Sequence, residues 1–264
     1  MDLIFCSLSS GSSGNCYYLG NRGHGILIDA GISATSIRNY LRTINVSMRS
    51  IDGVVVTHNH SDHIRGLEVF TRKNSIPAYA TMKVRESILA AEKKISPGYI
   101  KEIPMRQAFS LAGFEIEVFP VCHDAPETIG LHISAGTKKI TIATDLGHIC
   151  QTSAPYIKAA NLLVIESNYD EQMLLNGKYP QFLKARIKSD HGHLGNHQAA
   201  SFLAEMAGDN LENICLAHLS LNNNTPELAL NTLYKAFSER GIDLNGHPRI
   251  LVLERNRPSE MIKL

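Results

Sequence analysis

Short apolar runs separated by glycine, serine and asparagine dominate the first two thirds of the chain. The run at 53–57, Gly-Val-Val-Val-Thr, is rich in β-branched residues and is typical of a strand buried on both faces. Runs on either side of Ala112-Gly113 and of Gly136 predict two β-hairpins. On this basis we predict strands over residues 3–7, 16–19, 25–29, 53–57, 108–111, 114–121, 130–134, 139–144 and 162–165.

Helical patterns become prominent in the last third of the chain. Asn196 is a candidate N-cap for a helix over 197–207. Thr225-Pro226 is a strong start for a second helix that ends at Arg240, with Gly241 suited to the position just past its end. Earlier helices are expected to begin near Ser33 and Met82, and further strands to cover 214–218 and 249–254.

The order of these elements predicts the fold class. Strands come in two batches, each followed by helices, which is typical of an α+β fold built of layers. No segment has the composition of a linker, so residues 1–264 are predicted to form a single domain.

The composition fits a folded protein that lies outside membranes. With 264 residues, of which 44% are hydrophobic, the chain can bury a full core, which excludes a disordered or fibrous protein. No stretch approaches the ~18 consecutive apolar residues needed to span a bilayer, and residues 1–10 lack the pattern of a secretory signal. The five cysteines are scattered and form no C-x-x-C pair, which predicts reduced thiols and a cytoplasmic location.

The charge and the histidine content point to no partner by themselves. A net charge of +1 is no global sign of a nucleic-acid-binding protein, although it leaves room for a local basic patch. The twelve histidines are many for this length and call for an explanation. The oligomeric state stays open.

The densest group of histidines directly follows the strand predicted at 53–57. It reads Thr-His-Asn-His-Ser-Asp-His over residues 57–63. Imidazole and carboxylate are the ligands that zinc and similar divalent ions take, and alternate residues of an extended segment point the same way. His58 and His60 can therefore converge on one ion, while Asp62 and His63 can reach a second. The alternative is a chance cluster of surface histidines, but four ligand-type residues at this spacing favour a metal site.

This H-x-H-x-D-H motif resembles that of the metallo-β-lactamase superfamily, and four further motifs of that superfamily follow in order. They are represented by Asp29 before the histidine motif and by His123, Asp145 and His218 after it. The resemblance implies a four-layer αββα sandwich with two metal ions at one edge of two packed sheets. Taken alone, Asp29, His123, Asp145 and His218 could each be an ordinary polar residue at a turn or strand end.

The resemblance also implies a ligand for each ion. The first ion would be held by His58, His60 and His123, and the second by Asp62, His63 and His218, with Asp145 bridging both. Asp29 would hold a ligand histidine or its loop from behind. Zn²⁺ suits the imidazoles best, and the carboxylates also suit Mn²⁺ or Fe.

The chemistry implied by two such ions is hydrolysis. Ions about 3.5–4 Å apart lower the pKa of a bridging water toward ~7 and so supply a hydroxide nucleophile. Asp62 would orient that hydroxide and take its proton. Asp145 stands where β-lactamases of the main clinical type carry cysteine, which disfavours β-lactam hydrolysis.

Further blocks of sequence resemble one branch of the superfamily, the YycJ/WalJ branch. They are Ser-Gly-Ser-Ser-Gly-Asn at 10–15, Glu-Ser-Asn-Tyr-Asp at 166–170, residues 189–196, and His-Leu-Ser-x-x-Asn-Asn at 218–224. Tyr169 departs from the pattern, since the branch usually has histidine there. The branch is nuclease-like, with a proposed 5′-to-3′ DNA exonuclease activity, and it is similar to ribonuclease Z. The resemblance therefore implies a nucleic acid, DNA above all, as the substrate.

The same blocks suggest substrate contacts. His193 matches the histidine that assists phosphate cleavage in ribonuclease Z, and it would contact the scissile phosphate or protonate the leaving oxygen; it could instead merely cap or pack. The small residues of the 9–15 loop, with Ser12 and Asn15, could approach an anion closely, or could form a plain hairpin loop. Asn223 is a further candidate. A basic run could bind phosphate or form a solvated face, and it contains Lys184, Arg186 and Lys188.

Three functions remain open from the sequence. The leading one is a two-metal phosphodiesterase that acts on nucleic acid as an exonuclease. The second is a hydrolase of a small cyclic phosphodiester or thioester at the same site, and the third is a non-catalytic regulatory module. All five motifs are present, which argues against the third. His218 follows Asp145 by only 73 residues, too few for the large insertion of RNA-processing relatives.

Overall fold

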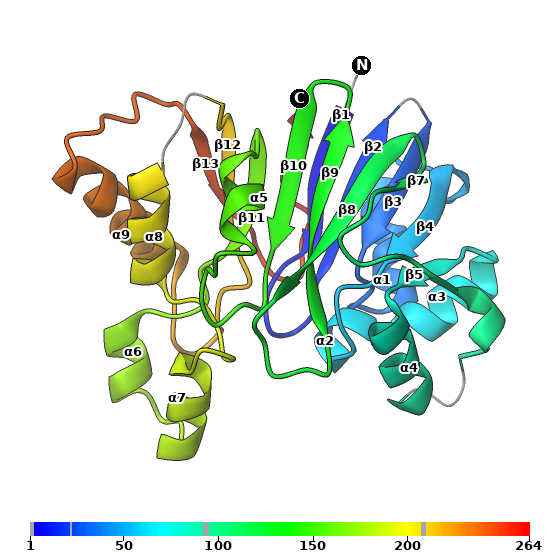
Figure 1. The fold of residues 1–264 in the computed structure, drawn as a ribbon, viewed down its shortest axis with the longest axis horizontal. Helices are drawn as coiled ribbons and strands as arrows, with labels where there is room; N and C mark the ends of the chain where they lie inside the picture. Colours follow the sequence, from blue (N-terminus) through cyan, green and yellow to red (C-terminus); the bar gives the residue numbers. More distant parts are fainter. Residues whose placement is uncertain (1–2, 22, 92–94, 207–209) are drawn as a thin grey trace.

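The computed structural model describes residues 3–21, 23–91, 95–206 and 210–264. Two seven-stranded sheets lie face to face at its centre (Figure 1). The first sheet has the order β14 (Ile262–Lys263), β1 (Leu3–Ser9), β2 (Cys16–Asn21), β3 (His24–Ile28), β4 (Ile51–Val55), β5 (Ala78–Ala80) and β6 (Ile100–Glu102). The second has the order β13 (Arg249–Val252), β12 (Asn213–Ala217), β11 (Leu162–Glu166), β10 (Lys138–Ala143), β9 (Thr128–Ala135), β8 (Phe114–Val121) and β7 (Phe109–Leu111).

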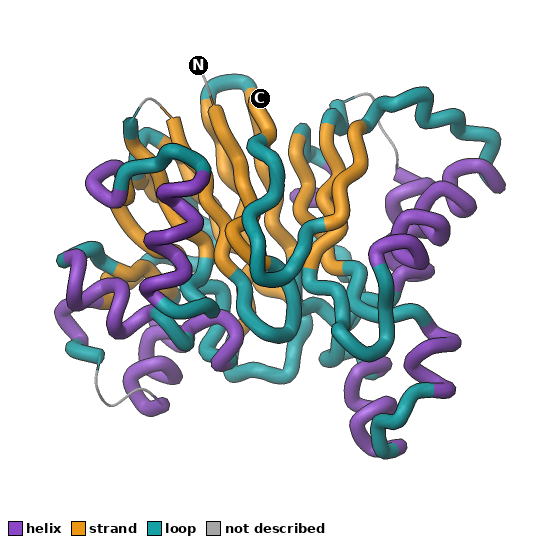
Figure 2. The backbone as a smooth tube through the Cα atoms, turned by 180° about the vertical axis from the view of Figure 1, so that it is seen from behind, coloured by secondary structure: helices purple, strands orange, loops and turns teal. Residues whose placement is uncertain are grey.

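Helices cover the outer face of each sheet (Figures 1 and 2). On the first sheet lie α1 (Ala34–Thr43), α3 (Leu67–Asn74) and α4 (Met82–Ala91), and on the second α5 (Ala154–Lys158), α8 (Asn196–Met206) and α9 (Pro226–Glu239). Three short helices lie near the lower edge of the sheets in Figure 1, namely α2 (Ser61–Ile64), α6 (Glu171–Asn176) and α7 (Gln181–Lys188). Two 3₁₀ turns cover Met48–Ser50 and Pro97–Tyr99. None of the described helices has the length and apolar character to cross a bilayer.

The alternation of side chains along the strands produces three apolar layers. In β3, Ile26 and Ile28 join the core between the sheets, whereas Leu27 joins the layer beneath α1. In β12, Cys215 faces the same central core and Leu216 faces α8 and α9. Strands buried on both faces need apolar residues at every position, as the sequence pattern indicated. The predicted αββα sandwich is confirmed.

Most predicted boundaries agree with the structure. Both hairpins form, at β7–β8 and β9–β10. The side chain of Thr225 caps α9 by accepting a hydrogen bond from the backbone N–H of Leu228, and Gly241 beyond that helix has a positive φ of 69°. The sequence did not predict α2, α3, α5, α6, α7 or the short strands β5, β6 and β14.

One predicted cap is wrong. Asn196 lies inside the first turn of α8 and its side chain points into the protein, where its Oδ1 accepts a hydrogen bond from Ser167 and its Nδ2 donates to Asn224. The side chain of Gln198 instead accepts from the backbone N–H of Gly195. Ala207, the predicted end of this helix, lies outside the described residues.

Three residues of the sequence motifs sit just past strand ends in a left-handed backbone conformation. Asp29 follows β3 with φ 61°, Asp145 follows β10 with φ 57°, and His218 follows β12 with φ 56°. Residues other than glycine adopt this conformation at a cost of roughly 1 kcal/mol or more, and they persist where the surrounding structure holds them. The chain therefore turns sharply at all three residues, at the edge of the sheets that also carries the histidine motif.

Candidate metal centre

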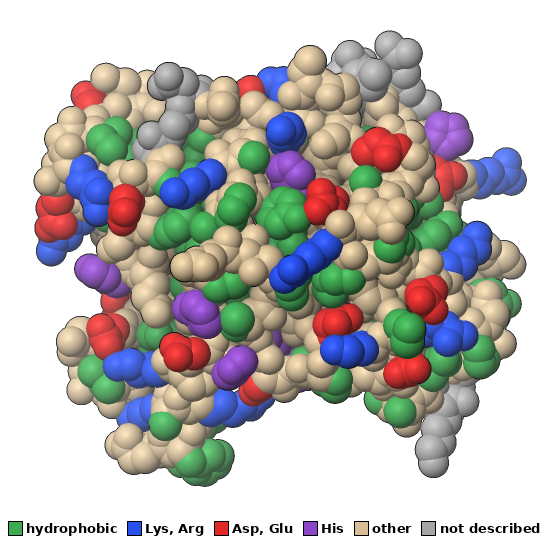
Figure 3. Space-filling model, in the orientation of Figure 1, with side chains coloured by type: hydrophobic (Ala, Val, Ile, Leu, Met, Phe, Trp, Pro, Cys, Tyr) green, Lys and Arg blue, Asp and Glu red, His purple; other side chains and the backbone are tan. Residues whose placement is uncertain are grey.

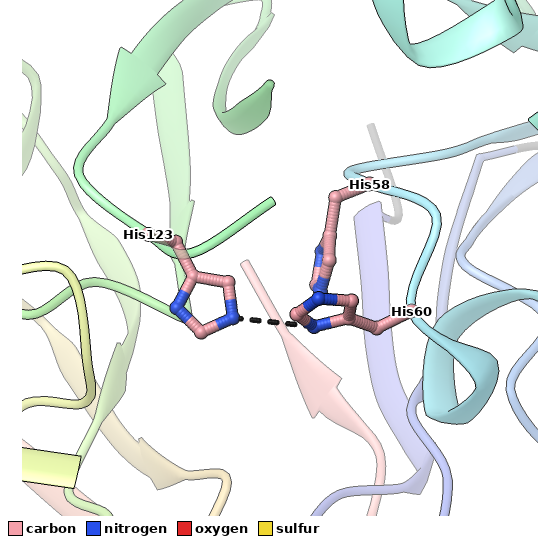
Figure 4. A group of neighbouring side chains, drawn as sticks. All are labelled: His58, His60 and His123. Carbon is pink, nitrogen blue, oxygen red and sulfur yellow. Dashed lines mark hydrogen bonds between the residues drawn. The ribbon is translucent and has the colours of Figure 1, made fainter. Parts of the chain in front are cut away.

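The segment after β4 and a loop of the second sheet bring three histidines together. His58 and His60 lie between β4 and α2, and His123 follows β8. Figure 4 shows the three rings converging, with the Nδ1 of His60 3.4 Å from the Nε2 of His123. Their ligand atoms all lie within 4.8 Å of one another. We call these three residues group 1.

A second set of donors lies beside group 1. The Oδ2 of Asp62 is 3.5 Å from the Nε2 of His63 and 3.4 Å from the Nε2 of His218. Asp62 and His63 belong to α2, whereas His218 comes from the far end of the second sheet, after β12. We call Asp62, His63 and His218 group 2.

Asp145 lies between the two groups. Its carboxylate is 3.3 Å from the Nε2 of His63, 3.5 Å from the Nδ1 of His218 and 3.8 Å from the Nε2 of His123. The structure therefore brings together all seven residues that the sequence predicted as metal ligands, at one edge of the two sheets.

Buried carboxylates stand behind the histidines of group 2. The Nδ1 of His63 is 2.7 Å from Asp29, which also accepts hydrogen bonds from the backbone N–H and the hydroxyl of Thr57. The Nδ1 of His218 is 2.9 Å from Glu166. Because Nδ1 donates its proton to a carboxylate in both cases, Nε2 of each ring is left to accept an ion.

Group 1 is supported by neutral oxygens instead. The Nδ1 of His58 lies 3.0 Å from the hydroxyl of Thr57, and the Nδ1 of His123 donates to the backbone carbonyl of Gly192 at 2.9 Å. His60 has a side chain that is 32% exposed, so this group opens to solvent.

One buried atom tests whether this donor set fits a metal. The Nε2 of His58 is buried and has no hydrogen-bond partner among the described residues. A buried polar atom left unpaired costs about 1–3 kcal/mol, which a bound cation would relieve. Burial lowers the pKa of both His58 and His60, which keeps these imidazoles neutral as metal binding requires. The residues present fit a divalent cation.

The carboxylates give the centre a surplus of negative charge. Burial opposes protonation of His218, but Asp145, Asp62 and Glu166 outweigh it and raise the pKa of His218 to about 10. Burial also opposes protonation of His63, yet its carboxylate neighbours raise the pKa of His63 well above its usual value. Protons on these two rings thus balance the carboxylates in the metal-free chain, and a bound cation would take over that role.

His193 lies beside both groups, and its predicted contact with the substrate stays a prediction. Its ring centroid is 5.0 Å from that of His123 and 5.3 Å from that of His218, and its side chain is 21% exposed. The Nδ1 of His193 is 2.7 Å from Glu166. Burial would lower the pKa of His193, but the charge and hydrogen bond of Glu166 raise it.

Glu166 was missed as a functional candidate. It is fully buried, and it contacts His193 and His218 with the same oxygen while accepting hydrogen bonds from the backbone N–H groups of Leu146 and Leu194. A carboxylate at the end of β11, beside strands that end in ligands, was the available signal.

Of the other residues predicted to contact the substrate, two are buried and one is exposed. Asn15 is buried, and its Nδ2 is 3.0 Å from the Nε2 of His63 while its Oδ1 accepts from the backbone N–H of Gly11. Asn223 is buried against Ser220 and has no hydrogen bond to a metal-centre residue within the described part of the chain. Their burial argues against direct substrate contact. Ser12 is exposed in the loop after β1, and its role stays a prediction.

The fold and the clustered donors define the class: a metallo-β-lactamase-fold protein with a candidate dinuclear metal centre. The family model described as the beta-lactamase superfamily domain matches residues 24–218, and the chain belongs to that superfamily. Its fold is similar to that of the metallo-beta-lactamase fold protein YhfI from Bacillus subtilis, with a TM-score of 0.73 and 17% identity over the whole of both chains.

Two relatives place the chain more narrowly, with the YycJ/WalJ proteins. It is 36% identical over 249 residues to the exodeoxyribonuclease YycJ of Bacillus anthracis, covering 91% of each chain. It is 33% identical over 234 residues to the exodeoxyribonuclease WalJ of Streptococcus pneumoniae, covering 88% of this chain and 87% of the relative.

Proposed function

We propose that this protein is a metal-dependent exodeoxyribonuclease that degrades DNA from the 5′ end. The observation that supports this most strongly is its likeness to YycJ over 91% of both chains, together with a complete cluster of metal-type donors. The five motifs match a hydrolase, and the carboxylate of Asp145 at the junction suits phosphodiester rather than β-lactam chemistry.

Group 1 would hold one ion and group 2 the other, with Asp145 shared between them. We propose Zn²⁺ first, because five imidazoles suit it best, with Mn²⁺ or Fe as alternatives that the two carboxylates also suit. Two bound ions would lower the pKa of a water molecule and neutralise charge on the phosphate.

The chain's own residues then carry the proton transfers. Asp62, which is partly exposed, orients the attacking water and accepts its proton. The water oxygen bonds to phosphorus as the bond from phosphorus to the leaving oxygen breaks. His193, held at Nδ1 by Glu166, donates a proton from Nε2 to that leaving oxygen.

An end-labelled digestion assay tests the proposal. Single- and double-stranded DNA and RNA, labelled at either the 5′ or the 3′ end, are incubated with purified protein and Mn²⁺ or Zn²⁺. We expect early release of labelled mononucleotide from 5′-labelled DNA, and its loss in His193→Ala and with EDTA. If metal-loaded protein leaves every labelled end intact, the nuclease proposal is wrong.

The same assay separates the two other functions. Turnover of a cyclic nucleotide or a thioester, with all polynucleotides intact, would favour a small-molecule hydrolase at the same site. Full metal loading without hydrolysis of any ester would favour a regulatory module.

The five described cysteines are all free thiols, which supports our proposal of a cytoplasmic location.

A further inference from the structure

Helices α6 and α7 form a hairpin that projects beside the metal-centre edge of the sheets (Figures 1 and 2). The segment 177–188 contains four basic residues and no acidic residue. Phe182 in α7 is 76% exposed, the highest value among the exposed large hydrophobic side chains of the described chain. At the lower left of Figure 3, several basic side chains lie among hydrophobic and acidic ones.

The exposure of Phe182 has no explanation in packing. Other residues hold the hairpin together, because the buried Lys184 donates a hydrogen bond to the carbonyl of Leu175 and Lys188 pairs with Glu171 at 2.6 Å. A phenylalanine that contributes so little buried surface adds little to folding. An exposed aromatic ring beside an exposed basic side chain suits a surface that binds a nucleic-acid strand by stacking.

The C-terminal end of α7 is tied directly to the metal centre. Arg186 pairs through its Nε with Asp124, whose other carboxylate oxygen is 3.3 Å from the Nε2 of His123. The backbone N–H of His193 donates to the carbonyl of Ile187 at 2.9 Å. A strand that lies along α7 would therefore reach group 1 at the C-terminal end of the helix.

Phe182 and Arg186 lie on the same face of α7. Residues four apart in a helix are neighbours on its surface, about one turn or 5.4 Å along the axis. The side chain of Arg186 remains 56% exposed despite its pairing with Asp124, so it is open to a further anion. An aromatic ring and a guanidinium at this separation match a base and a neighbouring phosphate.

We propose that the exposed face of α7 formed by Phe182 and Arg186 binds the single-stranded part of the polynucleotide beyond the scissile phosphate. Phe182 stacks on an unpaired base, and Arg186 contacts a backbone phosphate. Stacking needs a free base face, so the surface selects single-stranded over duplex nucleic acid at this point. This inference rests on the proposed nuclease function.

Kinetics on a long and a short substrate test the proposal. The metal-loaded wild type, Phe182→Ala and Arg186→Ala are each assayed on a 20-nucleotide oligothymidylate and on the p-nitrophenyl ester of thymidine 5′-monophosphate, which is too short to reach α7. We expect Phe182→Ala to raise KM for the oligonucleotide about tenfold, the size expected for one base stack. Arg186→Ala should also raise this KM, because it removes a phosphate contact. Hydrolysis of the short ester should stay unchanged in Phe182→Ala.

Two control variants match these changes. Tyr234→Ala removes an exposed aromatic from α9, where the residue is 49% exposed. Arg72→Ala removes an arginine that is 55% exposed and pairs through Nε with Glu68, as Arg186 does with Asp124. Neither control should change KM for the oligonucleotide.

Each contrary result has a distinct meaning. If the wild type degrades the oligonucleotide and the α7 variants keep its KM, the inference is wrong and the nuclease proposal stands. If the wild type hydrolyses neither substrate, the proposed nuclease function is wrong, and the inference that rests on it is wrong as well. A dimeric wild type that becomes monomeric in Phe182→Ala, with unchanged KM, would overturn the inference in favour of self-association. Loss of short-ester hydrolysis in Arg186→Ala would make Arg186 a positioning residue that acts through Asp124.

Discussion

Group 1 and group 2 contain similar donors but rest on different supports. The histidines of group 2 are backed at Nδ1 by the buried carboxylates of Asp29 and Glu166. The histidines of group 1 are backed by a hydroxyl and a backbone carbonyl, and His60 is open to solvent. A carboxylate behind an imidazole raises its basicity as a ligand and fixes its orientation.

The different supports predict that the two groups hold their ions with different affinities. Group 2 would hold an ion more firmly, because the orientation of its rings is fixed by charged hydrogen bonds. Group 1 faces the solvent and the α7 hairpin, so its ion would exchange more readily and lie closer to the incoming substrate. The four predictions that follow test this difference.

The largest effect is expected where the groups share a residue. Asp145→Ala removes the carboxylate that lies between them and should abolish binding of both ions. Hydrolysis of the thymidine ester should fall about 1000-fold or more, equivalent to about 4 kcal/mol of transition-state stabilisation. Elemental analysis of the purified variant measures the metal, and a variant that keeps both ions would contradict the bridging position.

Removing one histidine from each group compares them directly. His60→Ala should retain about one equivalent of metal, because group 2 stays intact. His63→Ala should retain less than His60→Ala, because no carboxylate contacts the Nδ1 of His58 or His123 in the described structure. Metal content after dialysis at matched protein concentration gives the answer. Equal retention by the two variants would show that the different supports have no consequence.

A smaller effect is expected from the residue behind group 2. Asp29→Asn keeps the shape of the side chain but removes the charge next to His63. The affinity of group 2 for its ion should therefore fall about 10–100-fold. Competition with a fluorescent chelator measures both affinities. Asp124→Asn, beside group 1, is the matched control and should leave the tighter ion unchanged, since Asp124 does not contact group 2 in the described structure.

The smallest effect is expected in the loop after β1. Asn15→Ala removes the acceptor for the backbone N–H of Gly11 and should lower the free energy of unfolding by about 1 kcal/mol in urea denaturation. Ser12→Ala at the exposed tip should leave that free energy unchanged. A raised KM for DNA in Ser12→Ala would support its predicted substrate contact, whereas an unchanged KM would remove it.

The fold was largely predictable because its strands are buried on both faces. The apolar run at 53–57 left few alternatives to a buried strand, although β4 begins and ends two residues earlier, at Ile51–Val55. The helix starts predicted near Ser33 and at Thr225 were found because both side chains cap a helix locally. The short strands β5, β6 and β14 were missed because two or three residues carry no periodicity. Their pairing depends on the neighbouring strand rather than on their own sequence.

Polar side chains were harder to place than apolar ones. Asn196 has the residue type of an N-cap, yet tertiary contacts with Ser167 and Asn224 turn it inward. Glu166 reads as an ordinary strand end, and its contacts with His193 and His218 join residues 27 and 52 positions away. Hydrogen bonds over such separations leave no periodic trace in the sequence.

The sequence by itself determined the layered fold, the candidate ligands and their order, because the histidine motif is local and each further ligand follows a recognisable strand end. Only the tertiary structure decided what stands behind each ligand and which surfaces lead to the centre. Asp29 reaches His63, Glu166 joins His193 to His218, and Arg186 meets Asp124 only after the two sheets have packed. These contacts depend on where distant strand ends come to lie, and that position is set by the packing of the whole core.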